Sequence, residues 1–224
     1  IGVAGIASNI VDKTMPPQFS EGLYFTNGVE ELPKVVEQLR GEEKADLVVL
    51  LSHLGFPQDM QLIQQVSGVD IDLSAHTHHR LAHAVHQGNT LVVQSGSHAA
   101  FITRLDLEIE NGTIVNYQHT LIEVSSSTTP DPEVNALVQS ALQPFRPELE
   151  QVVGSSRVPL DRGLNLEASM DNFLLSSLFA HTGAEIGFSN GWRYGAPILP
   201  GPILLNDLYN IAPMNPPIST VEIS

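Results

Sequence analysis

The sequence predicts an α/β fold for its first half, and three observations carry the prediction. Between residues 1 and 124, apolar runs of strand type alternate with stretches of helical periodicity. Two of these runs each lead directly into a loop that contains histidine. Further along, Asn111-Gly112 separates two alternating segments, which is a strong signal for a tight β-hairpin. We therefore expect strands and helices in alternation, followed by an antiparallel hairpin.

Hydrophobic spacing places the elements of this first half. A helix is expected from Gly28 to Arg40, because its apolar residues recur at intervals of three and four and form one buried face. These residues are Val29, Leu32, Val35, Val36 and Leu39. A second helical stretch runs from Asp59 to Val66. The strands are expected at Ile1–Ile6, Asp46–Leu51, Val69–Ser74, Thr90–Gln94, Ile102–Ile109 and Ile114–Leu121.

A run of Ser, Thr and Pro from Ser125 to Pro132 marks the clearest boundary in the chain. Asp131 before Pro132 has the pattern of an N-cap followed by proline at the first helical position. The helix that follows is expected from Val134 to Val153. Two prolines inside it should kink or divide it, namely Pro144 and Pro147.

The last part of the sequence predicts a helix from Leu166 to His181, a short strand from Ala184 to Phe188, and then a glycine-bounded loop. In that loop, the guanidinium of Arg193 is suited to binding phosphate or carboxylate, and the ring of Trp192 could stack on a base. The alternative is that the aromatic rings only pack beneath the domain.

Composition is that of a globular protein, since 42% hydrophobic residues can form a substantial core. A formal net charge of −15 disfavours nucleic-acid backbones and anionic lipid as partners. No apolar run approaches the roughly 18 residues of a membrane span. The chain has no cysteine, which excludes both a disulfide framework and a thiol nucleophile.

Three histidines carry the strongest chemical signal. His53 follows the strand expected at Asp46–Leu51, and His76 and His78 follow the strand at Val69–Ser74. Neutral imidazole is the commonest protein ligand for first-row divalent metals. A lone histidine at a strand end is more often just a hydrogen-bonded polar residue, but two such motifs at strand carboxyl ends favour a metal site. The other histidines lack this context and are expected at the surface or behind the ligands: His79, His83, His86, His98, His119 and His181.

The order of these motifs resembles the metallophosphoesterases, specifically the 5′-nucleotidase branch of the calcineurin-like superfamily. The segments that carry the resemblance are Ser52–Gly55, Gly68–Leu73, Ala75–His78, Val93–Ser97, Thr103–Ile109 and Phe188–Pro197. The resemblance implies part of a four-layered α/β/β/α sandwich, a linker helix and a partial α/β C-terminal domain. It assigns residues 1–125 to the back half of the catalytic domain, 126–153 to the linker and helix, and 154–224 to the front of the C-terminal domain.

The resemblance also implies two divalent ions, such as Mn²⁺ or Zn²⁺, that activate water for attack on a phosphate ester. His53 and His76 would bind one ion, and His78 the other. The family's remaining ligands, an Asp-x-His pair, a bridging Asp and an Asn-His-Glu motif, would precede Ile1 and are absent from this sequence. The chain alone is therefore expected to bind metal weakly and to catalyse little. A periplasmic or extracellular location is likewise implied by the family.

Related nucleotidases place an arginine of an Asn-Gly-Gly segment in the nucleotide pocket. By this resemblance Arg193, Asn190 and Trp192 are the expected substrate-binding residues. The loop Gly191–Gly195 is shorter than in nucleotidases, however, and is similar to that of the thiosulfohydrolases of bacterial sulfur oxidation, which share the fold. Three hypotheses follow: a phosphoesterase acting in nucleotide catabolism on a small phosphate ester, a thiosulfohydrolase that cleaves sulfonate from a carrier protein, and a non-catalytic member of the fold.

Overall fold

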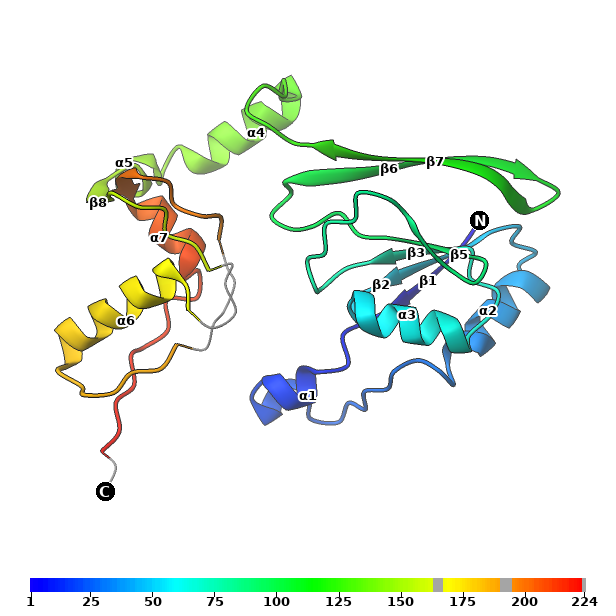
Figure 1. Cartoon of the computed structure of the whole chain (residues 1–224), viewed down its shortest axis with the longest axis horizontal. Helices are drawn as coiled ribbons and strands as arrows, with labels where there is room; N and C mark the ends of the chain where they lie inside the picture. The colour runs from blue at the N-terminus through cyan, green and yellow to red at the C-terminus, as the bar shows by residue number, and fades with distance from the viewer. Residues whose placement is uncertain (163–166, 190–194, 223–224) are drawn as a thin grey trace. The chain divides into compact units, whose positions relative to one another are not determined.

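The computed structural model describes residues 1–162, 167–189 and 195–222. The chain divides into two compact units, Ile1–Thr128 and Thr129–Ser224 (Figure 1). Each unit has a hydrophobic core of its own.

The first unit is built on a five-stranded sheet with the order β1-β2-β3-β5-β4. Four of its strands are parallel, and only β4 runs antiparallel to its neighbour. The strands are β1 (Gly2–Ile6), β2 (Val48–Ser52), β3 (Ile71–Ser74), β4 (Val85–Gln87) and β5 (Thr90–Val93). The predicted α/β class with parallel strands is confirmed; β4 was not predicted.

Two helices cover one side of this sheet and a β-hairpin lies on the other, as Figure 1 shows. The helices are α2 (Leu32–Gly41) and α3 (Phe56–Gln65), and the hairpin consists of β6 (Phe101–Glu110) and β7 (Thr113–Glu123). The core beneath the helices contains Ala4, Leu32, Val36, Val48, Leu50, Leu54, Leu62, Ile63, Val66 and Val69. At the hairpin turn, Asn111 and Gly112 have φ of 48° and 75°, as a type I′ turn requires. The predicted hairpin is confirmed. Between β1 and α2 lie two short elements that the sequence pattern did not reveal, α1 (Val11–Thr14) and η1 (Pro17–Phe19).

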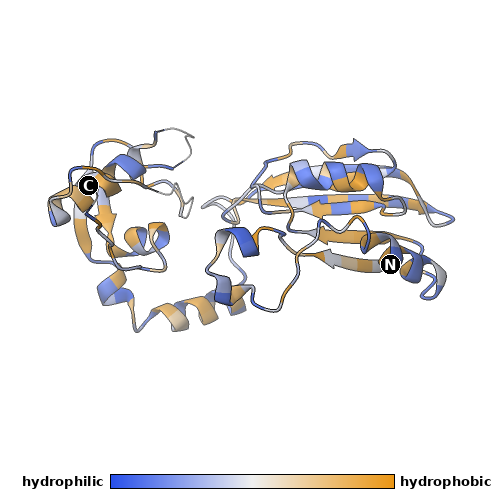
Figure 2. Cartoon of the chain, turned by 90° about the horizontal axis from the view of Figure 1, so that it is seen from below, coloured by the Kyte–Doolittle hydropathy of each residue, from blue (hydrophilic) through white to orange (hydrophobic). Residues whose placement is uncertain are grey.

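The second unit begins with α4 (Pro132–Leu142), which is capped as predicted. The Asp131 carboxylate accepts hydrogen bonds from the backbone N–H groups of Glu133 and Val134, 3.0 and 2.9 Å away. Figure 2 shows hydrophobic residues along much of this helix, and several are exposed. The chain then turns into the short helix α5 (Arg146–Leu149), so the predicted division near the two prolines is confirmed.

The predicted helix extends too far at its end, because residues 152–153 belong to a strand. This strand, β8 (Val152–Ser156), pairs antiparallel with β9 (Gly201–Leu204), which lies some fifty residues away in the sequence. Branched side chains at Val152 and Val153 suit a strand, and the distant partner supplies the hydrogen bonds. Two further helices, α6 (Ser169–Thr182) and α7 (Leu205–Ile211), complete the unit. Its core consists of Leu160, Met170, Ile198, Ile203 and Ile211.

The strand predicted at Ala184–Phe188 is wrong. This segment has no strand assignment, and the side chains of Ile186 and Phe188 are 64% and 88% exposed. An apolar run forms a strand only where a neighbouring strand can pair with it, and no described strand pairs here. In the part of the chain that the structure describes, no helix is long and apolar enough to cross a membrane.

Candidate metal-ligand loops and their support

The sheet brings two of the predicted ligands together. β2 and β3 are parallel neighbours, and Ser52 at the end of β2 lies opposite Ser74 at the end of β3. His53 follows Ser52 directly, and His76 comes two residues after Ser74. Their imidazole rings have centroids 4.9 Å apart and planes tilted by 56°. Both side chains thus lie at the carboxyl edge of the parallel strands, where α/β folds bind their ligands.

The backbone at His76 is held in an unusual conformation. Its φ is 71°, and the N–H of Thr77 donates to the carbonyl of Ala75 at 2.9 Å, which closes a γ-turn centred on His76. A γ-turn with positive φ at a non-glycine residue is rare and strained. His78 also has positive φ, at 58°. Strain of this kind persists where the surrounding structure imposes it, and it clusters at binding sites.

A further histidine lies beside the third predicted ligand. The rings of His78 and His98 have centroids 5.9 Å apart, and His98 and Ala99 have φ of 59° and 53°. From the sequence, His98 is expected at the surface or behind the ligands, and its side chain is exposed. His98 follows Gly96-Ser97 soon after β5, at the same edge of the sheet. This position is the sequence signal that marks it as a residue near the candidate site.

The donor set partly fits a divalent ion. Two imidazoles that bind one tetrahedral ion have ring centres roughly 5 Å apart, because the metal–nitrogen bond is about 2.1 Å. The 4.9 Å separation of the His53 and His76 rings agrees with this value. Within the described ranges, however, no three His, Cys, Asp or Glu side chains form a group that could hold an ion. These residues therefore fit part of a coordination shell.

Beneath the loops that carry His53 and His76 lies a buried polar cluster, which we call the strand-end network: Ser52, Asp59, Ser74 and Gln94. All four side chains are buried, and Asp59 on α3 has no exposed surface. The hydroxyls of Ser52 and Ser74 donate to the two carboxylate oxygens of Asp59, each at 2.5 Å. One carboxylate thus joins the ends of two adjacent strands.

Gln94 extends the network towards β5 and the His76 loop. Its amide nitrogen donates to the Ser74 hydroxyl and to the carbonyl of Ala75, both at 2.8 Å. Its amide oxygen accepts from the backbone N–H of His79. The residue pattern alone does not mark Asp59 and Gln94 as supporting residues. A polar side chain at the end of an otherwise apolar strand was the available signal for Gln94.

Two buried carboxyl groups share this face of the sheet, and their surroundings differ. Burial raises the pKa of Asp59, while the hydrogen bonds from Ser52 and Ser74 and the nearby His53 act in the opposite direction. Asp72 on β3 is also fully buried, but neither of its oxygens has a hydrogen-bond partner. Burial first, and then repulsion from Asp59, raises the pKa of Asp72 to about 8.

Gly55 allows the loops that carry His53 and His76 to approach closely. It has φ of 104°, and a Cβ at this position would lie 2.6 Å from Cγ2 of Thr77. We expect Gly55→Ala to lower the free energy of unfolding by about 1–3 kcal/mol, through backbone strain and this collision. Urea denaturation would measure the loss. Gly41→Ala at the end of α2 is the matched control, because its Cβ would meet no atom within 4 Å. Equal stability of the two variants would contradict the expectation.

In the second unit, a partly buried ion pair binds Ser189, the residue that precedes the predicted substrate loop in the sequence. The Arg162 guanidinium is 2.9 Å from the Asp171 carboxylate, and the Ser189 hydroxyl donates to the same carboxylate at 2.9 Å. The predicted substrate-binding residues Asn190, Trp192 and Arg193 lie outside the described residues.

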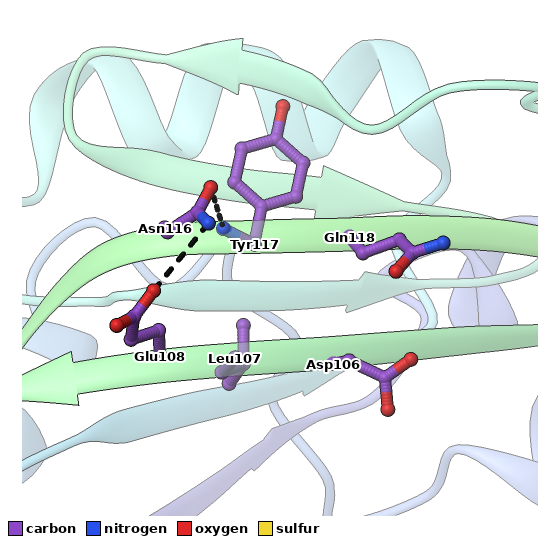
Figure 3. A pocket seen from close by; sticks show the side chains of 6 residues that line it. All are labelled: Asp106, Leu107, Glu108, Asn116, Tyr117 and Gln118. Carbon is purple, nitrogen blue, oxygen red and sulfur yellow. Dashed lines mark hydrogen bonds between the residues drawn. The ribbon is translucent and has the colours of Figure 1, made fainter.

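A hollow of about 240 Å³ lies on the hairpin (Figure 3). It is open to solvent, and its lining comes only from β6 and β7: Asp106, Leu107, Glu108, Asn116, Tyr117 and Gln118. Figure 3 draws two local hydrogen bonds there, from the Asn116 amide to Glu108 and from the Tyr117 N–H to Asn116. None of the predicted ligands takes part in it.

Comparison with known proteins supports the structural picture. No protein-family model matches the chain. The trifunctional nucleotide phosphoesterase protein YfkN of Bacillus subtilis is 25% identical over 95% of the chain. Among solved structures, the sulfate thiohydrolase SoxB of Thermus thermophilus covers 93% of the chain at 30% identity, with a TM-score of 0.87. A 5′-nucleotidase precursor, also from Thermus thermophilus, covers 94% at 21% identity, with a TM-score of 0.81.

The chain spans less than half the length of each of these proteins: 15% of YfkN, 39% of SoxB and 46% of the 5′-nucleotidase precursor. The similarity nevertheless runs along almost the whole of the chain. The resemblance predicted from the sequence motifs is thereby confirmed: the relatives and structural neighbours of this chain are 5′-nucleotidase- and SoxB-type metallophosphoesterases of the calcineurin-like superfamily.

Proposed function

We propose that the protein is a metal-dependent phosphoric ester hydrolase that acts on a nucleotide or a similar phosphomonoester. The observation that carries the proposal is the convergence of the His53 and His76 rings at the carboxyl edge of the sheet, with His76 on a strained turn. Relatives named as nucleotide phosphoesterase and 5′-nucleotidase favour phosphate esters as the substrate class. From the family resemblance we further infer that the protein acts in the periplasm or outside the cell.

The residues singled out from the sequence have distinct parts in this proposal. His53 and His76 hold one divalent ion, and His78 belongs to the other. When bound, the ions act as Lewis acids and lower the pKa of a water molecule. The chain's own contribution is to fix the imidazoles in place before metal binding, through the sheet register and the γ-turn. Arg193, with Asn190 and Trp192, is proposed to bind the anionic part of the substrate.

A second candidate is hydrolysis of a thiosulfonate. The specific observation in its favour is the 30% identity to SoxB, against 21% for the 5′-nucleotidase precursor of the same species. The short Gly191–Gly195 loop agrees with it. Both candidates use the same proposed metal ligands, so they differ in the substrate and not in the ions.

The full-length protein should therefore hydrolyse p-nitrophenyl phosphate or adenosine monophosphate only while divalent metal is bound. Treatment with a chelator should abolish the activity, and Mn²⁺ or Zn²⁺ should restore it. Phosphate release is the measurement, with a protein-bound thiosulfonate assayed in parallel under the same metal conditions.

Each outcome decides between the candidates. Activity on the phosphate esters that survives chelation would refute the metal-dependent proposal. Turnover of the thiosulfonate alone would assign the second candidate. Metal-loaded protein that is inactive on every substrate would favour a non-catalytic member of the fold.

A further inference from the structure

The buried carboxylate of Asp59 connects the two loops that carry His53 and His76, although it is not expected to bind metal itself. It lies in the first turn of α3, where its own N–H donates to the carbonyl of Gly55 at 2.9 Å. From this fixed position, each carboxylate oxygen accepts one serine hydroxyl at 2.5 Å. Ser52 directly precedes His53, and Ser74 precedes His76 by two residues.

The direction of these hydrogen bonds is determined by what else binds the serines. The Ser52 hydroxyl oxygen accepts the backbone N–H of Leu54 at 3.1 Å, and that of Ser74 accepts the Gln94 amide at 2.8 Å. Each hydroxyl therefore points its own proton at Asp59. The two hydroxyls donate to different oxygens of the same side chain. A carboxylate has an acceptor at both positions, whereas an amide has a donor at one of them.

The contacts leave the strand ends little freedom to separate. Ser52 and Ser74 are register partners in the parallel sheet, so the carboxylate spans one strand spacing. Gln94 binds the carbonyl of Ala75, which also closes the γ-turn at His76. A shift of either serine would move the histidine that follows it, and charge-assisted hydrogen bonds in a dry environment resist such a shift.

We propose that Asp59 is a positioning residue, whose two serine hydrogen bonds set the separation of the His53 and His76 imidazoles for a divalent ion. The inference rests on the proposed metal-dependent function. It gives Asp59 of α3 an indirect role, because this residue would affect ion binding only through the ends of β2 and β3.

The test is Asp59→Asn in the full-length protein, an isosteric change that replaces one acceptor oxygen with a donor. Titration with Co²⁺ should show a dissociation constant at least tenfold weaker than that of the unchanged protein, the usual range for residues that orient metal ligands. The visible spectrum of bound Co²⁺ should change because the ligand geometry changes. At saturating metal, the kcat of Asp59→Asn should lie closer to that of the unchanged protein than its metal affinity does.

Asp72→Asn is the matched control. It makes the same substitution at an equally buried carboxyl on the same face of the sheet, but Asp72 bonds to neither strand end. Its Co²⁺ affinity and spectrum should match those of the unchanged protein. If Asp59→Asn fails to fold, Ser52→Ala and Ser74→Ala carry the test, and each should weaken Co²⁺ binding.

The outcomes separate this inference from the function on which it rests. If the unchanged protein binds no Co²⁺, the proposed function itself fails. If it binds Co²⁺ and Asp59→Asn binds with the same constant and spectrum, only the positioning role is overturned. Equal weakening by Asp72→Asn would also overturn it, because the effect would then follow from burial of any carboxyl.

Discussion

Replacing His76 by alanine in the full-length protein should lower kcat/KM for a phosphate ester by about 10³-fold or more, a loss of ~4 kcal/mol in transition-state stabilisation. The imidazole of His76 lies against that of His53 at the separation expected for two ligands of one ion. Its strained turn shows that the structure holds this side chain at a conformational cost. Steady-state kinetics, together with metal content after dialysis, would measure the loss.

The matched control is His83→Ala, which removes an exposed imidazole a few residues further along the chain. This variant should keep both the metal content and the activity of the unchanged protein. If His76→Ala retains full activity and that activity survives chelation, His76 is not a metal ligand. The rate would then have to come from other residues.

The sequence predicted those features of the fold that depend on local pattern. Apolar runs of strand type located β2 and β3, and apolar residues at intervals of three and four located α2, because the buried residues of each element are visible in its own sequence. The Asn111-Gly112 turn and the Asp131 cap were predictable for a similar reason, since each is determined by the conformational preferences of one or two residues.

Features that depend on distant partners were not predictable in this way. β8 and β9 form a sheet only because they pair across some fifty residues, and the apolar run at Ala184–Phe188 lacks such a partner. Asp59 illustrates the same limit at the site. An acidic residue in the first turn of a helix is normally expected at the surface, where its charge interacts favourably with the helix dipole. Only the packing of α3 on the sheet shows that it is fully buried between two serines.

The largest expected effect on stability concerns Asp72. Its folded-state pKa of about 8 lies well above the value of 3.8 for an unperturbed aspartate. Between these two pH values the folded protein keeps the proton that the unfolded chain releases. Raising the pH should therefore destabilise the fold, by at most about 1.4 kcal/mol per pH unit. Stability from this group is fully present below pH ~4 and is lost as the pH rises through about 8.

Asp72→Asn should remove this dependence, because an amide of the same shape does not ionise. The variant should match the unchanged protein near pH 4, where both side chains are neutral, and should exceed its unfolding free energy by roughly 2 kcal/mol or more near pH 8. Urea denaturation of both proteins at the two pH values would measure the difference. Asp12→Asn, which removes an exposed carboxyl, should leave the pH dependence unchanged. If Asp72→Asn retained the full loss of stability between pH 4 and pH 8, the titration would belong to other groups, and the buried carboxyl of β3 would have to be ionised in the folded protein.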